Sequence, residues 1–306
     1  MRPAVLVVVG AEGTKEYGEQ FREWAGRWEA AAKKAQAEFA GVGLSEAGEK
    51  SDRDLLQERL AALSGKSAEA VWLVLIGHGT FDGKTAKFNL RGPDVTPAEL
   101  AAWIKPIERP LAIIDCTSSS GPFLNDLSAA NRVVVTAARS GFEYNYARFG
   151  DYISTAITDP KADLDKDEQT SLLEAFLLAA SGVKEFYAGE SRLATEHALI
   201  DDNGDKLGTP ADWFQGLRAT KTAKDGASLD GVRAGQMVLV RSQREERLPA
   251  EIRARRDQLE QDLAVARQRK SKLAEDEYLA LIEPILVELA KLYEGQQSES
   301  TTPKPQ

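Results

Sequence analysis

The sequence predicts an α/β fold, a mostly parallel sheet with helices on both faces, followed by an antiparallel helical hairpin. Four unbroken apolar runs have the composition of strands buried on both sides, and they lie at residues 3–10, 70–77, 110–115 and 132–137. Helical patterns separate these runs, which allows each strand to reach a parallel neighbour. After residue 240 the chain becomes strongly charged and has no glycine until residue 295, as expected for long helices.

Apolar residues spaced three or four apart predict the helices between the strands. The first such helix carries Tyr17, Phe21, Trp24 and Trp28 on one face, and we expect both tryptophans to pack on the sheet. Residues 53–63 predict a second, shorter helix. A third covers 96–104, because a threonine followed by a proline is typical of an N-cap and a first helical position.

The chain is predicted to divide into three parts. Residues 1–242 form the α/β domain, residues 243–295 the helical hairpin, and residues 296–306 a disordered tail. The hairpin seam is predicted from a heptad pattern on the last helix, with a facing seam on the preceding one; the residues are Leu279, Ile282, Leu286, Leu289 and Tyr293, facing Ile252, Leu259, Leu263 and Ala266. We expect this hairpin either to pack on the domain or to bind a partner helix.

Composition excludes several classes of protein. A formal net charge of −9 over 306 residues argues against nucleic acid as a partner, which requires a basic face. A single cysteine and two histidines exclude a disulfide framework and a multi-histidine metal centre. No run approaches the length of a membrane span, and no signal segment is visible. We therefore expect a cytoplasmic protein, or a secreted one whose leader is absent from this sequence.

Two predicted strands end in residues that can carry chemistry. The run 70–77 is followed by His78 between glycines, and the run 110–115 is followed by Cys116, Thr117 and Ser118. Because parallel strands end at the same edge of a sheet, we expect the histidine and the following turn to share one crevice. A thiolate beside an imidazole is a nucleophile for acyl transfer.

The segments VLVVVG, IGHG, IIDCTSSSG and RVVVTAARSG together resemble the legumain–caspase clan of cysteine peptidases, and bacterial caspase-like members most of all. The resemblance covers roughly residues 3–240. It implies a caspase-like sheet and an endopeptidase that acts on a protein or peptide substrate. It also implies a dyad of His78 with a cysteine, and an oxyanion held by amides at Gly79 and beside the nucleophile.

The nucleophile motif departs from the family pattern. IIDCTSSSG has one residue more between the apolar pair and the final Ser-Gly than the family has. Counting from the strand places Thr117 at the nucleophile position, counting from the Ser-Gly places Ser118 there, and Cys116 matches neither. Since only Cys116 has the intrinsic nucleophilicity, a local bulge would have to turn it toward His78. The alternative is a fold that has lost its nucleophile and binds without cutting.

An acidic segment predicts a calcium loop. In DLDKDEQTSLLE the oxygen-bearing residues fall at the spacing of an EF-hand-like loop, and they are Asp163, Asp165, Asp167, Gln169, Ser171 and Glu174. The glycine usual at the sixth position is Glu168 here. Asp201, Asn203 and Asp205 repeat the pattern more loosely. We therefore expect Ca²⁺ as a cofactor.

The function predicted first is thus a caspase- or legumain-like cysteine endopeptidase that uses a His78–Cys116 dyad. The alternative is a catalytically inactive homologue that acts as a calcium-dependent protein-interaction module.

Overall fold

The structure is a computed structural model that describes residues 1–46, 48–224 and 227–300, with side chains to residue 293. The chain separates into two compact units, of which the first spans Met1–Ser242 and the second begins at Gln243.

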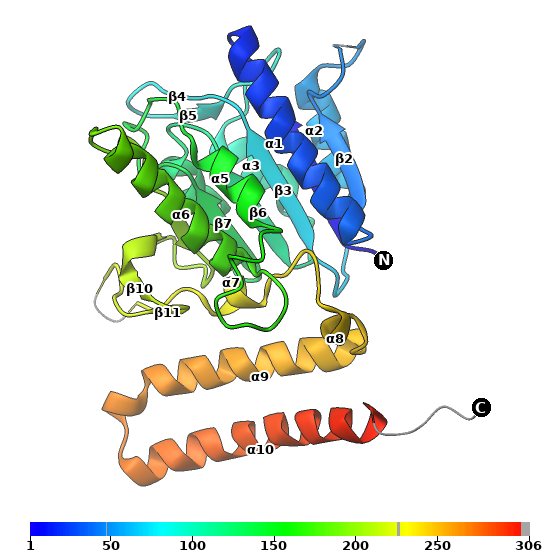
Figure 1. Cartoon of the computed structure of the whole chain (residues 1–306), viewed down its shortest axis with the longest axis vertical. Helices are drawn as coiled ribbons and strands as arrows, with labels where there is room; N and C mark the ends of the chain where they lie inside the picture. The colour runs from blue at the N-terminus through cyan, green and yellow to red at the C-terminus, as the bar shows by residue number, and fades with distance from the viewer. Residues whose placement is uncertain (47, 225–226, 301–306) are drawn as a thin grey trace, which may run out of the picture. The chain divides into compact units, whose positions relative to one another are not determined.

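The first unit is built on a seven-stranded sheet of order β2-β1-β3-β6-β7-β8-β9 (Figure 1). Neighbouring strands from β2 to β7 run parallel, and β8 and β9 join antiparallel at one edge. The strands are β1 (Ala4–Val9), β2 (Glu38–Val42), β3 (Val71–Ile76), β6 (Leu111–Asp115), β7 (Arg132–Thr136), β8 (Leu199–Asp201) and β9 (Thr209–Pro210). The four predicted strands are therefore confirmed, side by side, as β1, β3, β6 and β7.

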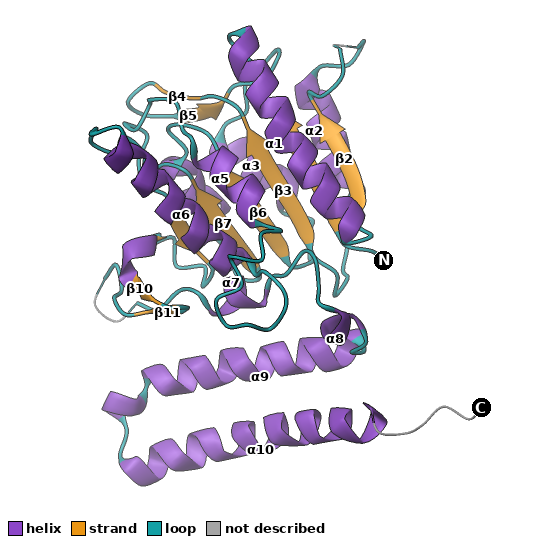
Figure 2. Cartoon of the chain, in the orientation of Figure 1, coloured by secondary structure: helices purple, strands orange, loops and turns teal. Residues whose placement is uncertain are grey.

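Helices cover both faces of this sheet, as Figure 2 shows and as the fold class predicted. One face packs against α1 (Lys15–Lys34), α5 (Phe149–Ala156) and α6 (Leu172–Gly189). The opposite face packs against α2 (Asp52–Ala62), α3 (Pro97–Ile104) and α4 (Gly121–Leu127). Trp24 and Trp28 are buried in the α1 core, as expected, and Thr96 caps α3 in a capping box.

Short elements complete the unit. They are the antiparallel pairs β4 (Gly79–Phe81) with β5 (Ala86–Phe88) and β10 (Phe214–Gln215) with β11 (Arg218–Ala219), the 3₁₀ turn η1 (Ala211–Trp213) and the helix α7 (Val232–Gln236). The edge strands β2, β8 and β9 were not predicted. They are short or partly exposed, so they lack the unbroken apolar run that identified the central strands.

The second unit contains the predicted helical hairpin. Its elements are α8 (Gln243–Glu246), α9 (Ala250–Gln268), the 3₁₀ turn η2 (Lys270–Lys272) and α10 (Glu275–Ser300). The helix α10 thus continues beyond residue 295, into the segment predicted to be disordered, and residues 301–306 of that predicted tail lie outside the described residues.

The hairpin seam differs from the prediction. Its buried core is Leu259 and Leu263 of α9 with Leu289 of α10, and Ile282, Ile285 and Leu292 pack against it. The prediction was right for Ile282 and Leu289. It was wrong for Leu279 and Leu286, which are 50% and 42% exposed; Tyr293 is 40% exposed, but its hydroxyl donates to Glu260 of α9. On α10, Ile285 and Leu292 pack against α9. Each lies one residue before a predicted seam residue, Leu286 or Tyr293.

Candidate functional site

The loops after β3, β6 and β7 leave the sheet at one edge. Leu75, Asp115 and Thr136 lie opposite one another in the ladder, so the segments that follow them start side by side. The Ser118 hydroxyl donates to the Gly79 carbonyl at 3.1 Å, and the Gly79 amide donates back to that hydroxyl at 3.4 Å. The structure therefore brings two of the predicted site residues into contact.

A side chain at position 79 would not fit this arrangement. A Cβ atom built on Gly79 would overlap the Ser118 carbonyl oxygen and lie 2.9 Å from the Thr117 hydroxyl. The contact also uses the Gly79 amide, which the family resemblance assigns to an oxyanion hole. That amide points at the Ser118 hydroxyl instead of at open solvent.

His78 is half-buried at the start of the same loop. Its Nε2 donates to the Glu12 carbonyl at 3.2 Å, and its ring lies 5.0 Å from the Tyr17 ring and 5.2 Å from the Phe21 ring, between centroids. Because a carbonyl oxygen can only accept, Nε2 carries a proton here. Among the described residues, no hydrogen bond joins this imidazole to Cys116, Thr117 or Ser118.

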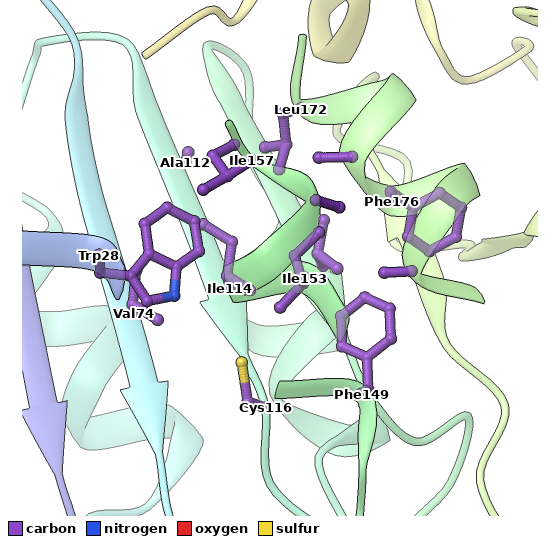
Figure 3. Packing of buried hydrophobic residues seen from close by; sticks show 14 of the residues in the cluster. Trp28, Val74, Ala112, Ile114, Cys116, Phe149, Ile153, Ile157, Leu172 and Phe176 are labelled. Atoms are coloured by element: carbon purple, nitrogen blue, oxygen red, sulfur yellow. The ribbon is translucent and has the colours of Figure 1, made fainter. Parts of the chain in front are cut away.

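Cys116 lies in the hydrophobic core. Its side chain is 0% exposed, and Figure 3 shows the sulfur beside Ile114 and turned into the cluster that contains Trp28 and Phe149. The cause is the regular alternation of a strand. The Cys116 amide donates to the Leu75 carbonyl at 2.9 Å, so the ladder continues past Asp115 and the side chain falls on the same face as Ile114. The predicted bulge is absent at this position.

Burial also makes the thiol a poor nucleophile. Desolvation raises the pKa of Cys116 well above its usual range, and the charges of Asp115 and Glu196 raise this pKa further. A raised pKa means that the thiolate, which is the reactive form, is scarce at neutral pH.

The two other nucleophile candidates have their hydroxyls engaged. Thr117 is 0% exposed and donates to Asp115 Oδ1 at 2.7 Å, while its amide donates to the same oxygen at 3.0 Å. Ser118 is 4% exposed and bonds to Gly79 as described above. Neither hydroxyl has an imidazole as a hydrogen-bonded base.

Asp115 holds this turn from inside the protein. Its Oδ1 accepts both Thr117 bonds, whereas its Oδ2 has no hydrogen-bond partner among the described residues. Complete burial raises the pKa of Asp115 to about 7, and the two Thr117 bonds oppose that rise. A substantial fraction of this carboxyl group is therefore neutral near physiological pH.

A second histidine, His197, was not predicted as a site residue and lies close to the same edge. Its Nδ1 is 2.6 Å from Glu143 Oε1, and Glu143 Oε2 accepts the backbone amides of Arg139 and His197. The Glu143 carbonyl in turn accepts the Ser119 amide at 2.8 Å. One glutamate thus ties together the loops before α4, α5 and β8. The Glu143–His197 pair could not be predicted, because the two residues are 54 positions apart and nothing in the local pattern marks His197.

Part of the predicted calcium loop does gather into a group. Single carboxylate oxygens of Asp163, Asp165 and Glu174 lie within 4.8 Å of one another. Lys166 and Glu168 have φ angles of 64° and 70°, so the loop bends through left-handed residues even though glycine is absent.

The remaining predicted ligands of this loop serve as structural acceptors and donors. Asp167 accepts the amide and the side chain of Gln169, and the Gln169 side-chain oxygen accepts the Ser242 amide. Ser171 is the N-cap of α6, and its hydroxyl and amide both donate to Glu174 Oε2 at 2.8 Å. The other oxygen of Glu174 accepts the Leu164 amide.

The second predicted loop does not form a comparable group among the described residues. Asp201 is buried and accepts the amides of Gly204 and Lys206. Asn203 accepts the Asp205 amide, and Asp205 accepts the Leu207 amide. These oxygens satisfy the loop's own backbone, which explains an acidic pattern without any metal.

Comparison with known proteins gives structural neighbours only. No family model matches the sequence, and no curated protein matches it. The Drosophila initiator caspase Dronc is similar over 66% of this chain and 80% of its own, at 14% identity and a TM-score of 0.44. Raptor of Chaetomium thermophilum is similar over 53% of this chain and 18% of its own, at 10% identity and a TM-score of 0.34. Neither likeness carries information about activity.

None of the helices in the described ranges has the length and apolarity to cross a membrane.

Proposed function

We propose that this protein is a caspase-like domain that binds a protein or peptide without cleaving it. The observation that carries the proposal is the position of Cys116. Its thiol is wholly buried on the face of β6 that α1, α5 and α6 cover, and this burial raises the pKa of the thiol. Cysteine peptidase chemistry requires a thiolate that can reach both an imidazole and a substrate carbonyl.

The surrounding residues support the same proposal. Thr117 and Ser118 occupy the two nucleophile registers, but their hydroxyls are bonded to Asp115 and Gly79. The Gly79 amide is used by Ser118. The turn after β6 is therefore closed by its own hydrogen bonds, which suits a rigid binding surface better than a reacting site.

A His78–Cys116 endopeptidase is the second candidate. It is favoured by the convergence of the β3 and β6 ends, where Gly79 touches Ser118. For activity, Cys116 would have to leave the ladder and turn to the opposite face, which would break its amide bond to Leu75 and open a gap in the core.

Thiol labelling separates these candidates. We expect iodoacetamide to label Cys116 at the rate of global unfolding in the native protein and rapidly in denaturant. His78→Ala should not slow the native labelling, because among the described residues no hydrogen bond links the imidazole to the thiol. Rapid native labelling that slows in His78→Ala would support the peptidase. Cleavage of fluorogenic peptides with basic, acidic or amide side chains would also support the peptidase, provided that Cys116→Ala abolishes it.

We also propose that Asp163, Asp165 and Glu174 bind Ca²⁺. Three carboxylate oxygens within 4.8 Å match the hard oxygen ligands that Ca²⁺ prefers. Bound Ca²⁺ would tie the loop to the first turn of α6, because Glu174 is also part of that helix cap. The binding function would then depend on calcium through the order of this loop.

Titration calorimetry tests the calcium proposal. We expect Ca²⁺ to release or absorb heat on binding and to raise the melting temperature. Asp165→Asn should abolish both effects, whereas Asp205→Asn, in the loop without such a group, should leave them unchanged. Glu174→Gln is a poorer variant because it also weakens the α6 cap. Equal responses of the two aspartate variants, or no response of the parent protein, would contradict the proposal.

A further inference from the structure

The helix α10 exposes a line of large apolar side chains. Leu279, Leu286 and Tyr293 are 50%, 42% and 40% exposed, and Val287 beside them is 45% exposed. A spacing of seven residues is close to two helical turns, so the first three lie in one stripe along the helix. We call Leu279, Leu286 and Tyr293 the α10 stripe.

This stripe runs beside the core of the hairpin. Ile282 and Leu289 follow Leu279 and Leu286 by three residues, and both pack against α9. The helix therefore has the two apolar positions of a heptad. One of them is filled by α9. At the other, Leu279 and Leu286 remain exposed among the described residues, while the Tyr293 hydroxyl donates to Glu260 of α9 at 3.2 Å.

Acidic residues accompany the stripe at the same spacing. Asp276 and Glu283 are exposed, lie seven residues apart, and each precedes a stripe residue by three. Between Glu275 and Tyr293 the helix has five acidic residues against Lys291 alone. In paired helices, charges at such flanking positions select the partner.

A second copy of this helix is a poor partner by the same rule. In an antiparallel pair, Asp276 and Glu283 would face the corresponding acids of the other copy. In a parallel pair they would face the flank that carries Tyr278 and Ile285, which offers no base. The α9 helix of a second copy is also unsuitable, since Val265 is its one exposed large apolar side chain among the described residues.

We propose that the α10 stripe binds an amphipathic helix of another protein, one with apolar residues at heptad spacing and Lys or Arg beside them. The apolar side chains would cover Leu279 and Leu286, and the basic ones would pair with Asp276 and Glu283. The hairpin would become a three-helix bundle. This extends the proposed binding function to a different surface and names the chemistry of its partner.

A pair of synthetic three-heptad peptides tests this proposal on the full chain. Both carry Leu at the core positions, and the flanking positions carry Lys in the basic probe and Glu in the acidic probe. We expect the basic probe alone to bind in fluorescence anisotropy. Leu279→Gln with Leu286→Gln should weaken that binding at least about tenfold. Asp276→Asn with Glu283→Gln should weaken it several-fold, and added salt should do the same.

A matched control removes two charges from α9 instead. Glu251→Gln with Asp262→Asn should leave binding of the basic probe unchanged, because both residues are exposed on the other helix. Equal binding of the two probes, or equal loss in both charge variants, would overturn the proposal.

Two further measurements identify another occupant of the stripe. If sedimentation shows self-association that the leucine substitutions abolish, and no probe binds, a second copy covers the stripe. If the same substitutions lower the melting temperature by several degrees and no probe binds, another part of this chain covers it. Either result overturns the proposal. None of these readouts involves Cys116, so they stay separate from the thiol test.

Discussion

Replacing Asp115 by asparagine should remove a large pH dependence of stability. Burial raises the pKa of Asp115 from its usual 3.8 to about 7. The folded protein therefore holds this proton more tightly than the unfolded chain. The stabilising contribution is complete below the unfolded pKa and is lost as pH rises through the folded one. A rise of about three pKa units corresponds to about 4 kcal/mol over the whole range.

Urea unfolding of the parent and Asp115→Asn proteins measures this effect. Between about pH 5 and about pH 8 the parent should lose about 2.5 kcal/mol more stability than the variant. Asparagine keeps an oxygen for the two Thr117 bonds, so the variant should fold. Asp126→Asn, at an exposed position of α4, is the control and should follow the parent. If stability falls with pH equally in the parent and Asp115→Asn proteins, the folded state does not bind a proton at a buried Asp115 carboxyl, and the reasoning is refuted.

Three other predictions concern the same domain. Gly79→Ala should destabilise the protein by at least about 2 kcal/mol in chemical unfolding, because its Cβ would overlap the Ser118 carbonyl. Gly189→Ala is the control and should not destabilise the protein, because a Cβ atom there meets open space. Burial and the charge of Asp202 raise the pKa of Asp230, so the melting temperature of Asp230→Asn, relative to the parent, should be higher at high pH than at low pH. An equal difference from the parent at both pH values would contradict this. Glu143→Gln should speed limited proteolysis of the loops around residues 139 and 197, because it loses the ion pair to Arg139 and weakens the hydrogen bond from His197.

The central architecture could be predicted because it depends on runs of like residues. Val5 to Val9 and Trp72 to Ile76 are apolar at every position, and only a strand covered on both faces needs that composition. Edge strands could not be predicted in this way. The strand β8 has three residues, and its position beside β7 depends on contacts with distant parts of the chain.

The α10 helix shows a related limit. A heptad pattern indicates which residues share a face, but it does not indicate which of two adjacent apolar lines an adjacent helix will cover. The sequence offers both the Leu279–Leu286–Tyr293 line and a line through Ile285 and Leu292, and α9 packs on the second. The choice depends on packing between the two helices, which no local pattern encodes.

The nucleophile question has a physical answer in the length of β6. The motif IIDCTSSSG has one residue too many, and a sequence alone cannot tell whether a strand absorbs that residue as a bulge or by running on. Here the ladder runs on, because the Cys116 amide pairs with Leu75. Alternation then sends Cys116 to the face covered by α1, α5 and α6, and Asp115, like Leu75 and Thr136 opposite it, to the other buried face. The thiol therefore packs in the core beside Ile114, where burial raises its pKa.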